Sequence, residues 1–206
     1  MVTILQREAP VLHASAELVN PKDFGSPRLN KIIAQMIAAL EKEDDGVAIA
    51  APQIGVPLRI FVVSHRAFEF AEQDGEPAIE EIAQKNTTLN ASKKNKPKYT
   101  NLVFINPEII KLSRKKKWAP EGCLSVRWLY GEVSRSEKAT VRGFDEHGKP
   151  FTRGASGLLA QIFQHETDHL NGVLFIDKAR NVEKITLAEQ KARERDMAAL
   201  DDLNAR

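Results

Sequence analysis

The 206-residue sequence predicts an α+β fold, and three observations lead to this prediction. Two segments, 28–43 and 158–170, repeat apolar residues at intervals of three and four, which is typical of amphipathic helices. Two short apolar runs, 60–63 and 102–105, are typical of buried strands. A further segment, 133–144, alternates apolar with polar residues, which favours a strand with one buried face.

In the first half of the chain we expect one helix and one strand. The helix at 28–43 is followed by Gly46, a residue that commonly ends helices. The strand at 60–63 has the sequence Ile-Phe-Val-Val. Residues 64–100 then form a polar connection that ends in Asn-, Ser- and Lys-rich sequence. Because a connection of this length is uncommon in a compact domain, we expect an insertion there.

The second half contains two further strands and a second helix. An Asn-Pro pair closes the strand at 102–105, and an Asp-Glu-His-Gly hairpin turn at 145–148 follows the strand at 133–144. The helix at 158–170 stops at Gly172. The last 30 residues carry seven basic and seven acidic side chains with few large apolar ones, which favours a solvated helix.

Composition excludes several classes of protein. Thirty basic and 28 acidic residues leave a net charge of +2, so we expect no DNA partner. The longest stretch without charged residues, 46–58, is shorter than the roughly 20 residues of a spanning helix, so we expect no membrane segment. We also expect no targeting segment at the start. Cys123 is the single cysteine, which favours a reducing, cytoplasmic location.

The most informative stretch is His165-Glu166-Thr167-Asp168-His169. Residues four apart on a helix lie one above the other, so the two histidines can bind one metal ion. Glu166 then lies beside a metal-bound water, where a carboxylate can accept a proton. The alternative is a core helix with incidental histidines, although unpaired polar groups among apolar neighbours are costly.

A catalytic metal needs a third protein ligand and an open position. One zinc-protease pattern places a third histidine six residues after His169, where this chain has Phe175. Another uses a glutamate further downstream, and Glu189 lies in that region. Cys123 is the remaining soft ligand, since a thiolate with two imidazoles suits zinc or ferrous iron. A metallopeptidase that cuts internal bonds, a non-catalytic metal-stabilised module and a buried inert thiol stay open as alternatives.

Three stretches resemble the signature motifs of peptide deformylases and occur in that family's order. They are Gly46-Val47-Ala48-Ile49-Ala50-Ala51-Pro52-Gln53, Glu121-Gly122-Cys123-Leu124-Ser125 and Gln164-His165-Glu166-Thr167-Asp168-His169. The resemblance extends from about Ile4 to Ile176, and the 64–100 stretch interrupts it. It implies an α+β fold with antiparallel sheets around a central metal-binding helix. It also implies a catalytic domain at 1–176, followed by a charged helical tail at 177–206.

The resemblance assigns a metal and its chemistry. The residues that match the metal ligands are Cys123, His165 and His169. One divalent ion is implied, with Fe²⁺ usual natively and Zn²⁺ or Ni²⁺ able to substitute. Glu166 matches the general acid/base. Gln53 and the backbone N–H of Leu124 match the groups that bind the formyl oxygen as it becomes an oxyanion.

The resemblance also assigns a substrate site. The matching positions are Val47, Ala48, Glu121, Gly122, Leu158 and Ile162. The backbone of Val47, Ala48 and Gly122 matches a strand-like edge that holds an extended peptide. Leu158 and Ile162 match walls of the pocket for the methionine side chain.

One supporting pair and three departures complete the resemblance. Glu121 and Arg135 match an ion pair behind the cysteine loop. Ala48 stands where glycine is usual, Arg127 where proline is common, and Tyr130 where a basic residue is frequent. These departures affect the expected substrate preference more than the hydrolysis, because no ligand position is lost.

The implied function is removal of the N-formyl group from the initiator methionine of nascent polypeptides, with release of formate. The implied partners are N-formylmethionyl nascent peptides, and transient ribosome association is a further hypothesis. Two basic clusters, 93–98 and 114–117, either contact ribosomal phosphate or are solvated surface loops.

Overall fold

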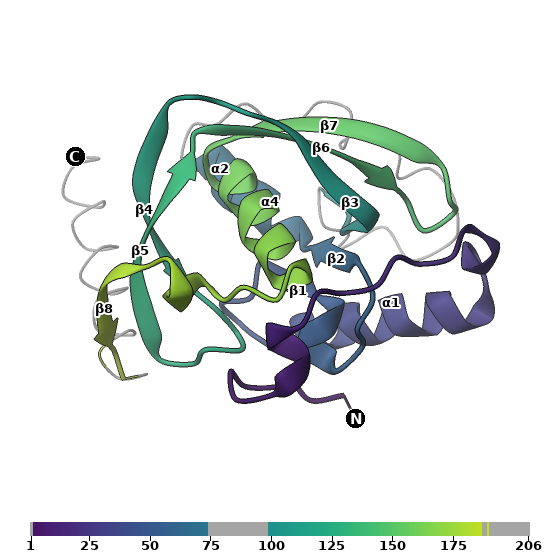
Figure 1. Cartoon of the computed structure of the whole chain (residues 1–206), viewed down its shortest axis with the longest axis horizontal. Coiled ribbons are helices and arrows are strands. Elements are labelled where there is room, and N and C mark those ends of the chain that lie inside the picture. The colour runs from purple at the N-terminus through teal and green to yellow at the C-terminus, as the bar shows by residue number, and fades with distance from the viewer. Residues whose placement is uncertain (1, 74–98, 187–188, 190–206) are drawn as a thin grey trace, which may run out of the picture.

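The computed structural model describes residues 2–73, 99–186 and 189, which form two antiparallel sheets and three α-helices (Figure 1). The helices are α1 (Pro27–Leu40), α2 (His65–Gln73) and α4 (Gly157–Leu170). The strands are β1 (Ala48–Ala50), β2 (Ile60–Val63), β3 (Leu102–Leu112), β4 (Lys116–Gly122), β5 (Leu129–Ser136), β6 (Lys138–Phe144), β7 (Pro150–Ser156) and β8 (Arg180–Lys184). The short 3-10 helices are η1 (Pro10–His13), η2 (Pro21–Asp23), η3 (Ala51–Ile54) and η4 (Phe175–Asp177).

One sheet has five strands in the order β1-β2-β3-β6-β7, and the other has three in the order β4-β5-β8. Helix α4 packs against strands of both sheets and occupies the centre of the molecule (Figure 1). The predicted α+β fold, with antiparallel sheets around a central helix, is therefore confirmed.

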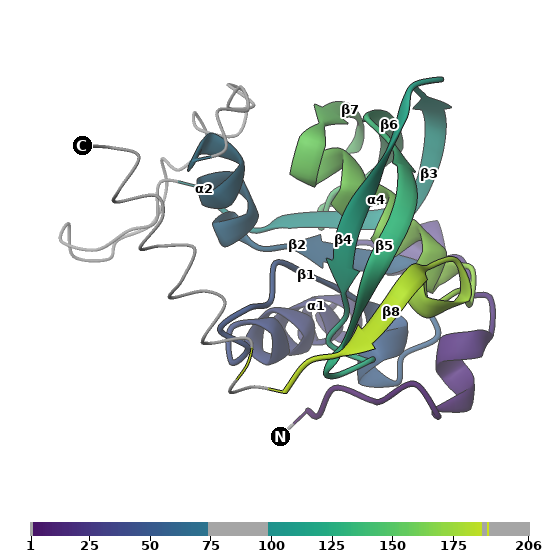
Figure 2. The ribbon, with the colours of Figure 1, turned by 90° about the vertical axis from the view of Figure 1, so that its left-hand side faces the viewer.

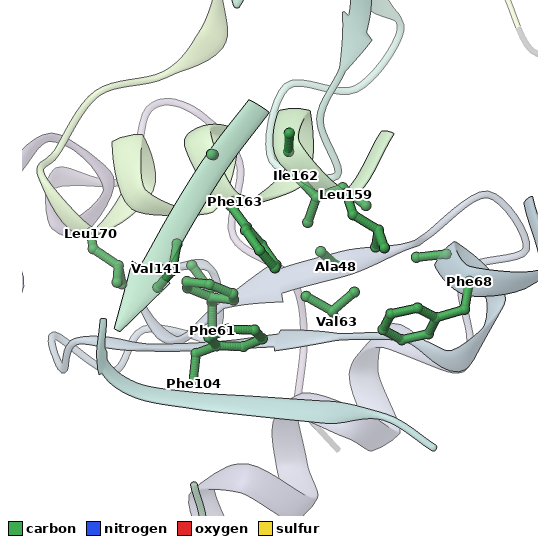
Figure 3. Packing of buried hydrophobic residues seen from close by; sticks show 14 of the residues in the cluster. Ala48, Phe61, Val63, Phe68, Phe104, Val141, Leu159, Ile162, Phe163 and Leu170 are labelled. Carbon is green, nitrogen blue, oxygen red and sulfur yellow. The ribbon is translucent and has the colours of Figure 1, made fainter. Parts of the chain in front are cut away.

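Strands β1 and β2 and the start of β3 are buried on both faces, because α4 covers one face and α1 the other (Figure 2). Successive side chains of a strand point to opposite faces. In β2, Phe61 and Val63 pack in the cluster of Phe163 from α4, as Figure 3 shows. Ile60 and Val62 pack in the cluster that contains the α1 side chains. This two-sided burial explains why β2 is an uninterrupted apolar run.

Helix α1 begins at a well-formed N-cap. The Ser26 hydroxyl accepts a hydrogen bond from the Leu29 N–H at 3.2 Å, and Pro27 occupies the first turn. The sequence predicts that this helix ends at residue 43, but it ends at Leu40. The Glu43 N–H donates to the Leu40 carbonyl in a turn that follows the helix. The acidic residues beyond Leu40 therefore belong to the connection to β1.

The prediction of a single strand at 133–144 is wrong, because this segment contributes to two strands, β5 and β6, in different sheets. The break lies at Glu137. Its N–H donates to the Lys115 carbonyl at 3.1 Å, and its carbonyl accepts from the Gly157 N–H at 3.2 Å. Because both hydrogen bonds involve residues from other parts of the chain, the alternation of apolar and polar residues does not predict the break. The hairpin turn predicted at 145–148 is confirmed, since it joins β6 to β7.

Strand β3 passes through the Asn106-Pro107 pair that the sequence predicts as its end. Its pairing register with β6 shifts between Ile105 and Glu108, and Asn106 has a φ of 50°. The Asn106 side chain bonds both backbone groups of Val19, at 2.8 and 2.9 Å. A bulge supported in this way accommodates the proline within the strand.

Two predicted segments extend beyond the described residues. The polar connection at 64–100 begins with helix α2, and residues 74–98 lie outside the described part. The tail predicted as a helix contains β8, which pairs with β5, so that prediction is wrong for this stretch. Residues 187–188 and 190–206 of the tail are not described. None of the helices in the described part has the length and apolarity needed to cross a membrane.

Candidate metal centre

The three candidate ligands come from α4 and from the loop after β4. Helix α4 presents His165 and His169 one turn apart, with ring centroids separated by 4.9 Å. Cys123 directly follows the last residue of β4, and its Sγ lies 3.2 Å from His169 Nε2. One ligand atom from each residue lies within 4.8 Å of the other two. A thiolate and two imidazoles at this spacing fit a tetrahedral divalent ion that keeps one position open.

A buried carboxylate orients His165 from behind. Glu121 Oε2 lies 2.9 Å from His165 Nδ1, and Arg135 donates two hydrogen bonds to the same carboxylate at 2.7 and 3.0 Å. Arg135 also donates to Asp168 at 2.6 Å, and Asp168 accepts from Lys178 at 2.7 Å. The ion pair expected between Glu121 and Arg135 is thus present. A histidine held through Nδ1 directs its Nε2 toward an ion.

These contacts and burial shift the pKa values of Glu121 and of the two histidines. Burial alone would raise the pKa of Glu121, but hydrogen bonds from His165 and Arg135 lower that pKa to about 2. Burial alone would lower the pKa of His165, but Cys123 and Glu121 raise it well above its usual value. Burial and the nearby His165 lower the pKa of His169 well below its usual value. Because a ligating nitrogen must be deprotonated before an ion binds, metal binding would release the proton that His165 holds.

Glu166 lies beside the ligands with its carboxylate buried. The residue is 3% exposed, and its Oε2 has no hydrogen-bond partner among the described residues. Burial raises the pKa of Glu166 to about 7, against a lowering by the charge of His165. A carboxyl group that titrates near neutral pH can both accept and donate a proton. The geometry is therefore consistent with the predicted general acid/base.

The Gln53 side chain reaches the ligands from η3. Its Oε1 accepts a hydrogen bond from the Ala50 N–H at 2.7 Å, which fixes the orientation of the amide. Its Nε2 donates to Ser125 Oγ at 3.1 Å and lies 3.6 Å from Cys123 Sγ. A side-chain N–H donor from η3 thus lies against the cysteine loop, which contains the Leu124 N–H.

A cavity of about 250 Å³ opens beside these groups. Its wall contains every position predicted to bind substrate, namely Val47, Ala48, Glu121, Gly122, Leu158 and Ile162. In the described part of the chain, β1 and β4 each form the edge of a sheet. One side of each strand therefore carries backbone groups without a strand partner. The Glu121 carboxylate is bonded to His165 and Arg135, so its side chain orients the metal ligand His165.

The cavity wall also contains residues that are not among the predicted site residues: Asp45, Gly46, Pro120, Arg127, Trp128, Leu129, Tyr130 and Gln161. The Gln161 amide donates to the Pro120 carbonyl at 2.8 Å. Because Gln161 lies one helical turn before His165, its place at the site could have been predicted from the sequence. Tyr130 lies opposite Gly122 in the β4–β5 ladder, and a Cβ on Gly122 would come within 2.8 Å of the Tyr130 ring. Glycine is needed there because the ring approaches the backbone closely.

The two positions at which zinc-protease patterns have a third ligand, Phe175 and Glu189, have other contacts in this structure. Phe175 stacks against His165 with ring centroids 6.3 Å apart, so it packs behind a ligand. Glu189 accepts hydrogen bonds from the Thr186 N–H and hydroxyl, both at 2.7 Å, and so closes a local turn. Neither arrangement favours the metallopeptidase alternative.

Comparison with known proteins gives consistent matches. The family model described as polypeptide deformylase matches residues 1–185. Peptide deformylase 1A, chloroplastic/mitochondrial, of Arabidopsis thaliana is 40% identical over 169 residues, which cover 82% of this chain and 58% of that protein. The chain thus spans little more than half of that relative. Peptide deformylase of Carboxydothermus hydrogenoformans is 38% identical over 166 residues, covering 81% of this chain and 87% of that protein. The Met-Ala-Ser-bound class I type b peptide deformylase of Acinetobacter baumannii matches with a TM-score of 0.67 and 28% identity, over 86% of this chain and 99% of that one.

Proposed function

The chain belongs to the polypeptide deformylase family, and we propose that it removes the N-formyl group from the initiator methionine of nascent polypeptides, releasing formate. The observation that carries this proposal is the meeting of a Cys-His-His ligand set with the buried Glu166 at one cavity. The relative from Acinetobacter baumannii binds Met-Ala-Ser, a peptide that begins with methionine as a deformylated product does.

The ligand set supports one divalent ion held by Cys123, His165 and His169. Such an ion supplies Lewis acidity to a water molecule and to the formyl carbonyl. Ferrous iron is our proposal for the native ion, with zinc or nickel as substitutes, on the strength of the motif resemblance. Elemental analysis of protein purified without oxygen tests it, and zinc alone at full occupancy in active enzyme would refute it.

The chain's own residues move the proton and stabilise the developing charge. Glu166 accepts a proton from the attacking water and later donates it to the departing amine, and a pKa of about 7 suits both steps. Gln53 Nε2 donates a hydrogen bond to the formyl oxygen as negative charge develops there, and the Leu124 N–H is the second donor. Loss of one such donor costs about 3 kcal/mol in comparable sites.

The substrate backbone lies along the free edges of β1 and β4 and adds a strand between them. The methionine side chain fits against Leu158 and Ile162, which lie on α4 in the turns before His165. Ala48, which replaces the usual glycine, belongs to the core cluster of Phe61 and Phe163 (Figure 3). Its methyl group is therefore accommodated by core packing.

Formate release from formyl-Met-Ala-Ser tests the function directly. Glu166→Gln should keep its metal content and lose nearly all turnover, because only the proton shuttle is removed. Glu108→Gln, a carboxylate on the exposed part of β3, serves as the matched control and should retain wild-type turnover. The role assigned to Glu166 fails if the metal-loaded Gln variant keeps more than a few per cent of the rate.

We extend the proposal to a cytoplasmic location, supported by the single free cysteine, and to transient ribosome contact. Residues 114–117 are exposed at the end of the β3–β4 connection and the start of β4, and Lys115 pairs with Glu137 at 3.0 Å. The other basic cluster, 93–98, lies outside the described residues. Alanine at Lys115, Lys116 and Lys117 should weaken co-sedimentation with ribosomes at low salt without changing formyl-peptide hydrolysis. Unchanged co-sedimentation would exclude the 114–117 cluster as the contact.

A further inference from the structure

The segment that leads into β1 packs closely against the end of α1. We call residues 41–47 the α1–β1 connection; residues 45–47 line the cavity, and β1 follows directly. Two turn bonds fold the connection on itself, because the Glu43 N–H donates to the Leu40 carbonyl and the Gly46 N–H donates to the Glu43 carbonyl, both at 3.1 Å. A Cβ on Gly46 would come within 2.8 Å of Leu40 Cδ1. The position of the connection therefore depends on that of the helix end.

Three carbonyl groups of this region accept hydrogen bonds from the start of α2 and the residue before it. Arg66 donates to the Leu40 carbonyl at 3.0 Å and to the Asp44 carbonyl at 3.1 Å. The Ser64 N–H donates to the Val47 carbonyl at 2.8 Å, and the Ser64 hydroxyl accepts from the Arg66 N–H at 3.3 Å. Arg66 thus bridges the end of α1 and the middle of the α1–β1 connection, while Ser64 holds the end at which β1 begins.

The end of α1 favours a cation that the helix itself does not provide. The last carbonyl groups of a helix have no partner within the helix, and a positive charge is stabilising there. The last turn of α1 contains no basic residue. Of residues 41–45, four are acidic and one is basic. Arg66 supplies the positive charge from α2, and its planar fork of donors reaches two carbonyls at once, whereas a lysine ammonium is a single point charge.

We propose that Arg66 is a positioning residue for the peptide substrate, because it holds the α1–β1 connection in the conformation in which β1 can bind a peptide backbone. The inference rests on the proposed function. Arg66 is not among the described residues that line the cavity, so it acts through backbone carbonyls and not on the substrate itself. Arg66 also lies near the start of the 64–100 segment, which the sequence predicts as an insertion. The beginning of that segment thus contributes to the proposed substrate edge.

Loss of the bridge should weaken substrate binding without slowing the bound complex. Without Arg66 the connection samples conformations that do not bind peptide, and the apparent dissociation constant rises by the reciprocal of the competent fraction. For the loss of two charge-assisted hydrogen bonds we expect a rise in KM of about tenfold in Arg66→Leu. Saturating substrate restores the binding conformation, so kcat should stay within about twofold of wild type. Metal content should be unchanged, since the ligands lie on α4 and in the cysteine loop.

The test measures kcat and KM for formyl-Met-Ala-Ser, metal content, and binding of the product Met-Ala-Ser by calorimetry. Arg66→Leu should raise KM and the dissociation constant of the product by similar factors. Arg66→Lys keeps the charge but not the fork of donors, so its KM should lie between those of Arg66→Leu and wild type. Wild-type KM in Arg66→Lys would show that charge alone suffices and would overturn the bridging role. Arg142→Leu, which removes an exposed pair outside this cavity, should leave both constants unchanged.

A purely structural helix cap predicts a different result. If Arg66 only stabilised the end of α1, Arg66→Leu would lower the free energy of unfolding but keep wild-type KM and product binding at temperatures at which it is folded. That outcome overturns the proposal, and so does a fall in kcat at unchanged KM. Should Arg66→Leu fail to fold, Arg66→Lys carries the same comparison. Weaker product binding in the variants of a chain that released no formate would support the positioning role and contradict the proposed function alone.

Discussion

Replacing Arg135 with leucine removes the cation at the centre of the network behind His165. Arg135 is 5% exposed and donates two hydrogen bonds to Glu121 and one to Asp168. Leucine fills part of the same volume but donates none of them. The Glu121 carboxylate then stays buried with His165 as its remaining charged partner.

The structure indicates a large effect. Removing one partner of a buried, hydrogen-bonded ion pair typically costs about 3–5 kcal/mol, because the other charge stays buried without compensation. We therefore expect Arg135→Leu to lower the free energy of unfolding by that amount. We also expect a 10–100-fold loss of metal affinity, since the support of His165 through Glu121 weakens.

Arg142→Leu is a matched control. Arg142 donates two hydrogen bonds to Glu108, at 2.7 and 3.0 Å, but both side chains are about 60% exposed. Its loss should cost at most about 1 kcal/mol. Urea unfolding of the metal-free variants gives the two free energies, and competition with a chelator gives metal affinity. The reasoning is refuted if both substitutions cost the same, or if Arg135→Leu binds metal as tightly as wild type.

Three further predictions concern the same centre. Cys123→Ala should lower both metal content and formate release, and reductant should not restore them; full metal occupancy by elemental analysis would show that the thiol is not a ligand. Gly122→Ala should reduce turnover because the added methyl meets the Tyr130 ring, and a second change, Tyr130→Ala, should restore part of it; no recovery in the double variant would contradict this cause. The pKa of Glu121 falls from 4.5 to about 2 on folding, so its contribution to stability is complete above pH 4.5 and is lost as the pH falls toward 2. Unfolding of metal-free Glu121→Gln should depend less on pH across that window, and identical slopes would refute the assignment.

Features with a local cause could be predicted from the sequence. The His165 and His169 spacing depends only on helix geometry, and α4 places both rings together. Strand β2 was predictable because burial on both faces leaves no polar position. The turn between β6 and β7 was predictable because Gly148, with a φ of 78°, supplies the conformation that the turn requires.

Features that depend on pairing between distant segments could not be predicted. Strand β4 contains Lys116, Lys117 and Pro120, which a sheet tolerates because β4 is an edge strand, but its sequence alone resembles a loop. The break at Glu137 depends on its hydrogen bonds with Lys115, which precedes β4, and with Gly157, the first residue of α4. The ion pair between Arg127 and Asp45 has the same origin, since the two residues lie 82 positions apart.

The metal centre depends both on local helix geometry and on contacts between segments that are distant in the sequence. Cys123 lies 46 positions before His169, so the thiolate reaches the imidazoles only if α4 packs against β4 and β5. Besides the contacts of His165 and Asp168, two amide side chains of α4 form these links: Gln161 donates to the Pro120 carbonyl, and Gln164 bonds both backbone groups of Ser136 at 3.0 Å. These bonds hold the strands that frame the cysteine loop. A change that loosens them separates the thiolate from the imidazoles while the helix keeps both rings in register. Metal affinity is therefore coupled to the packing between helix and sheet rather than to the helix alone.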